Sequence, residues 1–163
     1  MSVSKGLPPF QRFLEAHRDA VWRFLVSSVG RDEAEDCFQE TFIAALRAYP
    51  RLRSGSNMRA WVLTIAHRKA IDAHRGRARR ALPIAEVAEI AGADERALCS
   101  PADDDDLWKA VHGLPARQRS AVVLRYVADL PHRDIATAIG CSEEAARRSL
   151  HEGLVKLRKL VPA

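Results

Sequence analysis

The sequence predicts an all-α protein of two small helical domains joined by a flexible acidic linker, with a helix-turn-helix in the C-terminal domain. Apolar residues recur at helical spacing, and no stretch alternates apolar and polar residues as a half-buried strand does. Hydrophobic residues make up 47% of the 163 residues but aromatic residues only 6%, so we expect cores of Leu, Val, Ile and Ala. Glycine and proline cluster between the helical stretches, where they mark turns.

The charge falls into three blocks, which set the predicted domain boundaries. Residues 1–80 hold 15 Lys/Arg against 8 Asp/Glu, residues 81–106 hold 1 against 8, and residues 107–163 hold 10 against 5. We therefore expect one domain at 1–80, a linker at 81–106 with a short helix at 84–91, and a second domain at 107–163. The two basic blocks would suit a polyanionic partner such as nucleic acid.

The first domain is expected to hold three helices. An apolar stripe at spacings of three, four and seven predicts a helix that starts near Pro9. Asp32 is the predicted N-cap of a second helix, which stops at Pro50. A third helix starts near Asn57 and runs into the basic tail at 75–80. The stripe of the first helix consists of Phe10, Phe13, Leu14, Val21, Phe24 and Leu25.

The C-terminal domain ends in a predicted helix-turn-helix. Gly140 ends a short helix, since glycine readily adopts the left-handed conformation, and Ser142 is the N-cap of the last helix. In such a motif the second helix lies in the major groove of DNA, with its N-terminal half at the base edges. The candidate DNA-contacting residues are Glu144, Arg147, Arg148, Ser149, His151 and Glu152. The alternative is an ordinary two-helix hairpin with a solvated basic side.

The pattern of reactive residues argues against an enzyme. The histidines are scattered, the cysteines lie far apart, and neither G-x-x-x-x-G-K-S/T nor HExxH is present. We therefore expect no catalytic site, no metal and no cofactor. No run of about 18 apolar residues and no apolar leader is present, which predicts a cytoplasmic protein without a membrane span.

Three motifs resemble those of bacterial RNA polymerase sigma factors of the small, extracytoplasmic-function type. The first, AEDCFQETF at 34–42, is similar to the pattern A-E-D-aliphatic-x-Q-E-x-F, although Cys37 and Phe38 replace the commoner aliphatic pair. The second lies in 58–75 and the third in the C-terminal half, and together the matches cover about 10–80 and 107–160. The matching residues of the second and third motifs are Trp61, Ile65, Ala66, Asp72 and Arg75, then Leu114, Pro115, Arg119, Asp134, Ile135, Ala136 and Gly140.

The resemblance implies a promoter-specificity subunit that binds core RNA polymerase and promoter DNA, recognises two promoter elements and helps to melt DNA. It implies that Asp36, Gln39 and Glu40 dock on the polymerase. It also implies that the loop at 51–57 and the third helix hold the upstream element as a single strand. The candidate residues for this melted element are Arg59, Trp61, His67, Arg68 and Arg75.

Some residues leave alternatives open or depart from the family pattern. Trp61 suits core packing as well as stacking on DNA, and Asp72 is expected to pair with Arg68 or Arg75. Pro131 stands where the family often has a serine cap, so we expect Asp129 to cap the short helix.

The resemblance also leaves two questions about partners. Relatives are commonly held inactive by an anti-sigma protein, which makes such a protein a candidate partner. The alternative function is a two-domain helix-turn-helix regulator that does not engage polymerase, although this does not explain the motif at 31–46.

Overall fold

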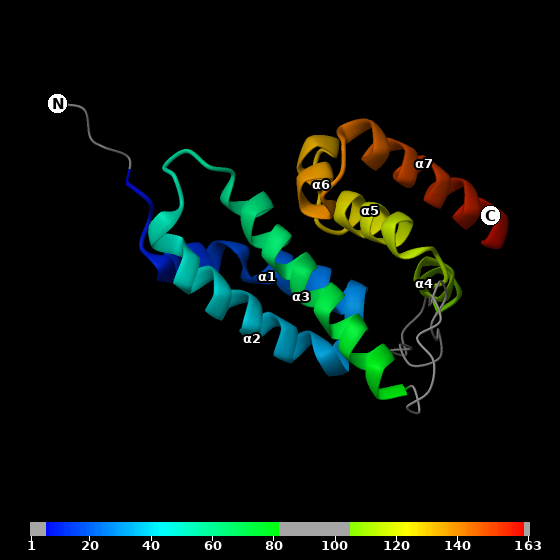
Figure 1. The fold of residues 1–163 in the computed structure, drawn as a ribbon, viewed down its shortest axis with the longest axis horizontal. Coiled ribbons are helices and arrows are strands. Elements are labelled where there is room, and N and C mark those ends of the chain that lie inside the picture. Colours follow the sequence, from blue (N-terminus) through cyan, green and yellow to red (C-terminus); the bar gives the residue numbers. More distant parts are fainter. Residues whose placement is uncertain (1–5, 82–104, 162–163) are drawn as a thin grey trace.

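The computed structural model describes residues 6–81 and 105–161, and all regular secondary structure in these ranges is helical, which confirms the all-α prediction (Figure 1). Residues 82–104, which include the helix expected at 84–91, lie outside the described residues. The elements are α1 (Phe10–Val29), α2 (Arg31–Ala48), the 3-10 helix η1 (Tyr49–Arg51), α3 (Met58–Ala81), α4 (Asp105–His112), α5 (Ala116–Tyr126), α6 (His132–Ile139) and α7 (Glu143–Leu160).

Helices α1, α2 and α3 pack on one another around an aromatic cluster. The Phe13 ring lies 5.1 Å from the Tyr49 ring and 5.7 Å from the Trp61 ring, and it is almost completely buried. The Tyr49 hydroxyl donates a 2.6 Å hydrogen bond to the Pro8 carbonyl, so its polar atom is satisfied. Because each buried aromatic or aliphatic side chain contributes about 1.5–3 kcal/mol, this cluster stabilises the first three helices as a unit.

The turn between α1 and α2 is tighter than the sequence suggested. Gly30, at φ 81°, ends α1 and also occupies the N-cap position of α2, which begins at Arg31. Asp32 therefore lies in the first turn of α2 and is not its N-cap, contrary to the prediction. A positive φ at glycine reverses the chain within one residue, and the carboxylate of Asp32 still meets the positive end of the helix dipole.

The helix-turn-helix is formed by α6 and α7. Gly140 adopts the left-handed conformation at φ 77°, and the Ser142 hydroxyl accepts a 3.1 Å hydrogen bond from the Ala145 amide, so both predicted caps are confirmed. Asp129 does not cap α6; it has φ 54° and precedes Pro131, which occupies the N-cap position without a side-chain bond. A proline needs no partner for its missing N–H, and its fixed φ suits the start of a helix.

The two halves of the chain lie against each other. Helix α6 packs on α3 and α5 packs on α1, whereas α2 and α7 lie on opposite outer sides (Figure 1). Within the second half, α7 crosses α5 closely at Gly153, where a Cβ atom would lie 3.0 Å from Val122. This arrangement decides which polar helix faces reach solvent.

Candidate polymerase and nucleic-acid interfaces

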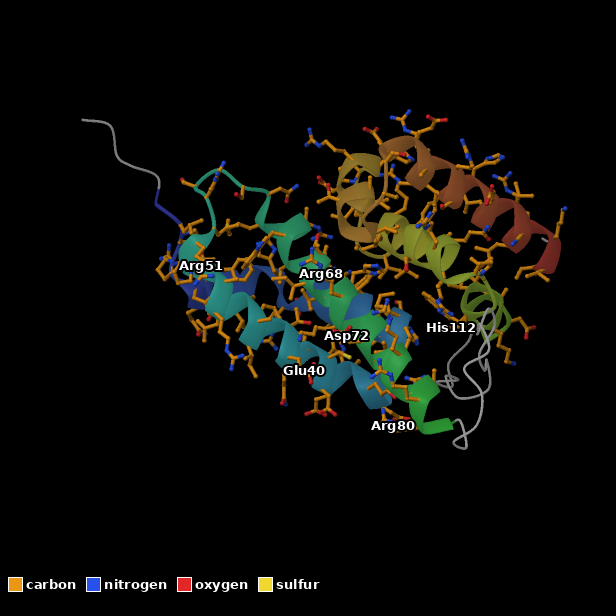
Figure 2. The ribbon with its side chains drawn as sticks, viewed as in Figure 1. Glu40, Arg51, Arg68, Asp72, Arg80 and His112 are labelled. Carbon is orange, nitrogen blue, oxygen red and sulfur yellow. The ribbon has the colours of Figure 1, made fainter. Side chains whose placement is uncertain are left out.

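The outer face of α2 is open and polar. Asp36, Gln39 and Glu40 are all exposed, and Figure 2 shows Glu40 on the side of α2 away from the second half. Helical spacings of three and four place the three side chains on one face. The opposite face of α2 is buried in the core and consists of Ala34, Cys37, Thr41, Phe42 and Ala45. The structure therefore presents the three predicted polymerase-docking residues together on one exposed surface.

Two apolar side chains extend this surface, and sequence reasoning missed them. Ile43 is 50% exposed and Leu46 is 53% exposed, although most large apolar residues of the first domain are buried. Both follow the polar residues at helical spacing, Ile43 three residues after Glu40. The signal was available in the sequence, because these two residues lie outside the stripe of core positions on α2. We define the α2 face as Asp36, Gln39, Glu40, Ile43 and Leu46.

The buried side of α2 holds no reactive thiol. The Cys37 thiol lies 3.9 Å from the Lys69 carbonyl and is almost completely buried. Burial, together with the neighbouring Glu33 and Glu40 carboxylates, raises the pKa of Cys37 to about 11. A thiol with so high a pKa is protonated at neutral pH, so it serves as a small apolar core residue.

The predicted melted-element residues of α3 lie in different environments. Arg59 is half-buried, and its guanidinium donates to the Ala128 carbonyl from Nε at 3.2 Å and from Nη2 at 2.7 Å. Trp61 is partly exposed but packs on the Phe13 and Tyr49 rings, which supports the core-packing interpretation. Arg68 and Arg75 are exposed. We define the α3 face as Arg59, Arg68 and Arg75.

His67 is buried, contrary to the prediction that it lies on an open DNA-binding surface. Its side chain is 7% exposed, and its ring centroid lies 6.4 Å from that of Phe24. Burial, with a smaller contribution from the Arg68 charge, lowers the pKa of His67 to about 4. The ring is therefore neutral at pH 7. The physical reason is that His67 packs against Phe24 of α1 and borders a small cavity lined by residues of α5, contacts that the sequence of α3 alone does not reveal.

A groove of about 510 Å³ separates α3 from the second half. On the α3 side it is lined by Arg68, Asp72 and Arg75, and Figure 2 shows Arg68 and Asp72 on this helix. The opposite wall is formed by residues 116–120 of α5 and by residues 137–140 at the end of α6. Among the described residues no ion pair joins Asp72 to Arg68 or Arg75, so the pairing expected from the sequence is absent here.

A smaller cavity of about 20 Å³ lies deeper between the halves, next to His67, His74 and Arg119. Its size is that of one water molecule. Burial, followed by the charges of Arg119 and Arg77, lowers the pKa of His74 to about 4, although a hydrogen bond with the Ser28 backbone acts in the opposite direction. Burial also lowers the pKa of His112 in α4. The contact between the halves therefore holds neutral histidines.

The N-terminal half of α7 is exposed and rich in charge. Arg147 pairs with Glu143 at 2.6 Å and Arg148 with Glu144 at 3.2 Å, and both arginines are well exposed. His151 is exposed too. These pairs between residues four apart pre-orient the arginines but contribute only about 0.3–0.5 kcal/mol each, so a DNA partner can displace them.

Two predicted DNA-contacting residues of α7 are engaged within the protein itself. Ser149 is 8% exposed, so it does not lie on the outer face as the sequence suggested. Glu152 is exposed, but its carboxylate accepts a 2.9 Å hydrogen bond from the Gln118 side-chain amide of α5. The close approach of α7 to α5 at Gly153 accounts for both, because neighbouring positions are drawn towards α5.

The residues that the structure describes contain no cluster of three or more His, Cys, Asp or Glu side chains suited to a metal ion. Within the same residues, no helix combines the length and apolar character needed to cross a bilayer.

Comparison with known proteins assigns the two halves to families. The chain matches Sigma-70 region 2 over residues 13–80 and Sigma-70, region 4 over residues 104–157. It is 32% identical over 160 residues to the ECF RNA polymerase sigma factor SigD of Mycobacterium tuberculosis, covering 92% of this chain and 76% of SigD. It is 30% identical over 167 residues to the RNA polymerase sigma factor CarQ of Myxococcus xanthus, covering 93% and 88%.

Solved structures agree with this assignment. The sigma factor RpoE of Bartonella quintana, in complex with the anti-sigma factor NepR, has a TM-score of 0.75 at 26% identity, covering 93% of this chain and 95% of RpoE. CnrH, in complex with the cytosolic domain of CnrY, shares the fold with a TM-score of 0.67 at 20% identity, covering 93% and 86%. The chain belongs to the ECF RNA polymerase sigma factors. It is a promoter-specificity subunit that binds core RNA polymerase and promoter DNA.

Proposed function

We propose that three separate surfaces carry the work of this sigma factor. The domain at 1–80 docks on core polymerase through the α2 face and holds the melted upstream element with the loop at 51–57 and the α3 face. The domain at 107–163 reads the other promoter element as duplex DNA through α7. The observation that carries this proposal is the joint exposure of Asp36, Gln39 and Glu40 on a helix whose opposite side is buried.

The α2 face has the composition of a protein-docking surface. It combines acidic and amide side chains with Ile43 and Leu46, two apolar residues that are about half exposed. Exposed apolar groups beside polar ones are typical of interfaces, in which a desolvated apolar centre supplies affinity and the polar rim supplies orientation. The partner is a basic and apolar surface of core polymerase.

The test is a charge reversal on the α2 face. Asp36→Arg should abolish capture of the chain by purified core polymerase, because it places like charges opposite each other. Binding to duplex promoter DNA should be unchanged, since Asp36 is exposed and far from α7. Asp19→Arg on α1, another exposed carboxylate, is the matched control. Normal capture of Asp36→Arg by polymerase contradicts the docking proposal.

The α7 surface reads base edges through Arg148, with Arg147 and His151 beside it. Arginine can donate two bonds to guanine, and such a pair discriminates by about 1–3 kcal/mol. Arg148→Ala should therefore weaken binding to the preferred promoter by this amount and relax sequence choice, measured by competition between promoter variants. An equal loss on every sequence identifies Arg148 as a phosphate contact instead. Ser149 is buried and the Glu152 carboxylate accepts a hydrogen bond from Gln118, so neither residue belongs to this surface.

The chain has no enzymatic activity of its own and needs no cofactor, since polymerase supplies the chemistry. It acts in the cytoplasm, where bacterial RNA polymerase is found. An anti-sigma protein is a candidate partner, supported by the likeness to RpoE, whose structure was solved with the anti-sigma factor NepR. Co-purification from cells after tagging the chain tests this last point.

A further inference from the structure

We propose that the groove between α3, α5 and α6 binds a nucleoside diphosphate or triphosphate. The groove measures about 510 Å³, and sites that hold one small ligand usually measure about 300–1,000 Å³. A single strand of DNA is bound over several nucleotides along a continuous surface, so a space of this size favours one small molecule. Among the described residues that line the groove, none belongs to α2 or α7.

Three guanidinium groups from two helices line this groove. Arg68 and Arg75 lie on α3, about two turns apart, and Arg117 lies in the first turn of α5. All three are exposed, and within residues 6–81 and 105–161 none of them makes a hydrogen bond or an ion pair. Like charges that line one groove without a partner repel one another. A bound phosphate chain removes this repulsion and accepts paired hydrogen bonds from the planar guanidiniums.

The start of α5 adds to this positive potential. Ala116 and Arg117 are the first two residues of α5 and line the groove, and Pro115 at the N-cap provides no side-chain bond. The Arg119 amide donates a 2.9 Å hydrogen bond to the Pro115 carbonyl, whereas the amides before it have no acceptor within the helix. They lie at the positive end of the helix dipole, where a phosphate is stabilised. The dipole therefore attracts the same anion as the three arginines.

The groove also carries groups that suit the sugar and the base of a nucleotide. Asp72 lies on α3 beside Arg68 (Figure 2) and pairs with neither arginine of that helix within the described residues. Its carboxylate can accept hydrogen bonds from ribose hydroxyls or from the N–H groups of a base. Ile71 and Ile139 are partly buried on the two walls and offer an apolar contact to a ring. This combination favours a nucleotide over inorganic phosphate alone.

A nucleotide in the groove has a consequence for the melted promoter element. Arg68 and Arg75 belong to the α3 face, which holds the single strand in the proposed function. The same guanidiniums cannot bind a nucleotide and a DNA phosphate at once, so the two ligands compete. This competition rests on the proposed function of the α3 face, whereas the nucleotide site itself does not.

Equilibrium dialysis of the full chain with ATP, GTP and pyrophosphate at physiological ionic strength tests the site. We expect saturable binding of ATP or GTP with a Kd below about 1 mM. Arg117→Ala should weaken this binding about tenfold, because it removes a charge-assisted contact. Arg117 belongs to no predicted polymerase or DNA surface. Arg23→Ala, which removes an exposed arginine of α1, is the matched control and should leave the affinity unchanged.

A second variant separates nucleotide recognition from plain attraction of an anion. Asp72→Ala removes an acceptor for the base or sugar and also a negative charge beside the phosphates. The affinity for the nucleotide relative to pyrophosphate should therefore fall about three- to tenfold. An unchanged ratio overturns the assignment to a nucleotide. Unaltered helical circular dichroism is expected for each variant, since Asp72 and Arg117 are exposed.

The failure of this site and the failure of the proposed role of α3 are distinguishable. Absence of saturable binding, or equal binding by Arg117→Ala and the unaltered chain, overturns the nucleotide site and leaves the role of α3 intact. Fluorescence anisotropy with a short labelled single strand measures the competition, and saturating nucleotide should lower single-strand affinity about fivefold or more. Unchanged single-strand affinity overturns the competition. A chain that binds the nucleotide but no single strand overturns the role of α3 and supports the site.

Discussion

Helices α2 and α3 are neighbours in one bundle, and each carries a polar face with a predicted binding role, yet these two faces have opposite environments. The α2 face is open to solvent, whereas α3 packs against α6 and shares a groove with α5 and α6. On α2 the carboxylate of Glu40 is 62% exposed, whereas on α3 the imidazole of His67 is buried. The comparison teaches that a polar helix face is not by itself an accessible one, because another part of the chain can cover it.

The largest expected effect is a loss of folding stability in acid, which arises from the buried histidines of α3 and not from the α2 face. His67 and His74 have pKa values of about 4 in the folded chain, below the ordinary value of 6.5. Between these values the unfolded chain binds more protons, so the stability contributed by the neutral rings is complete above pH 6.5 and is lost as the pH falls towards 4. From pH 7.5 to pH 5 the free energy of unfolding should fall by about 2 kcal/mol for each histidine.

Urea unfolding at the two pH values measures this effect. Gln in place of both histidines should flatten the pH dependence, because glutamine does not titrate in this range. Replacement of the exposed His151, which lies on α7 away from the contact, is the control and should leave the dependence unchanged. A pH dependence that persists without His67 and His74 means that other groups cause it.

An intermediate effect sharpens the description of the α2 face. Ile43→Ser with Leu46→Ser should lower the affinity for core polymerase by about thirtyfold, because burying two half-exposed apolar side chains contributes about 2 kcal/mol. Surface plasmon resonance with immobilised core polymerase measures the loss. The thermal stability of the free chain should change little, since both side chains are exposed. Unaltered affinity shows that polar contacts alone orient and hold this face.

The smallest effect concerns one contact between the start of α3 and the start of α6. Asp134→Ala removes the acceptor of the Asn57 amide, and a single exposed hydrogen bond contributes about 0.5–1 kcal/mol. Single-strand affinity should therefore rise about two- to fivefold, measured by fluorescence anisotropy. Asp134→Asn keeps an oxygen acceptor and is the matched control. A decrease in affinity means that Asp134 supports the DNA-binding surface and does not restrain it.

Much of the local structure was predictable from the sequence. The turn between α6 and α7 was expected in full, because Gly140 and Ser142 act through backbone φ and a hydrogen bond three residues away. Asp32 and Asp129 were assigned wrongly as caps for a related reason. In each case a neighbouring residue, Gly30 or Pro131, occupies the N-cap position instead. The backbone φ that these two residues favour decides where the helix begins.

The site residues were less predictable wherever a distant segment intervened. Ser149 was expected on the outer face of α7, but the contact of α7 with α5 at Gly153 turns it inward. His67 follows the helical pattern of a solvent-facing basic stripe, yet it is buried and packs against Phe24 of α1. By contrast, Asp36, Gln39 and Glu40 were placed correctly on one exposed face, because no other described element packs on that side of α2.

The sequence by itself determined the helices, the turn of the helix-turn-helix, the order of the motifs and the alternation of basic and acidic blocks. These depend on spacings of a few residues, over which helix geometry is nearly constant. Only the tertiary structure decided which polar faces are open. The bond from Arg59 to Ala128 joins residues 69 positions apart, and a contact over such a separation depends on how complete helices pack together and not on any local pattern.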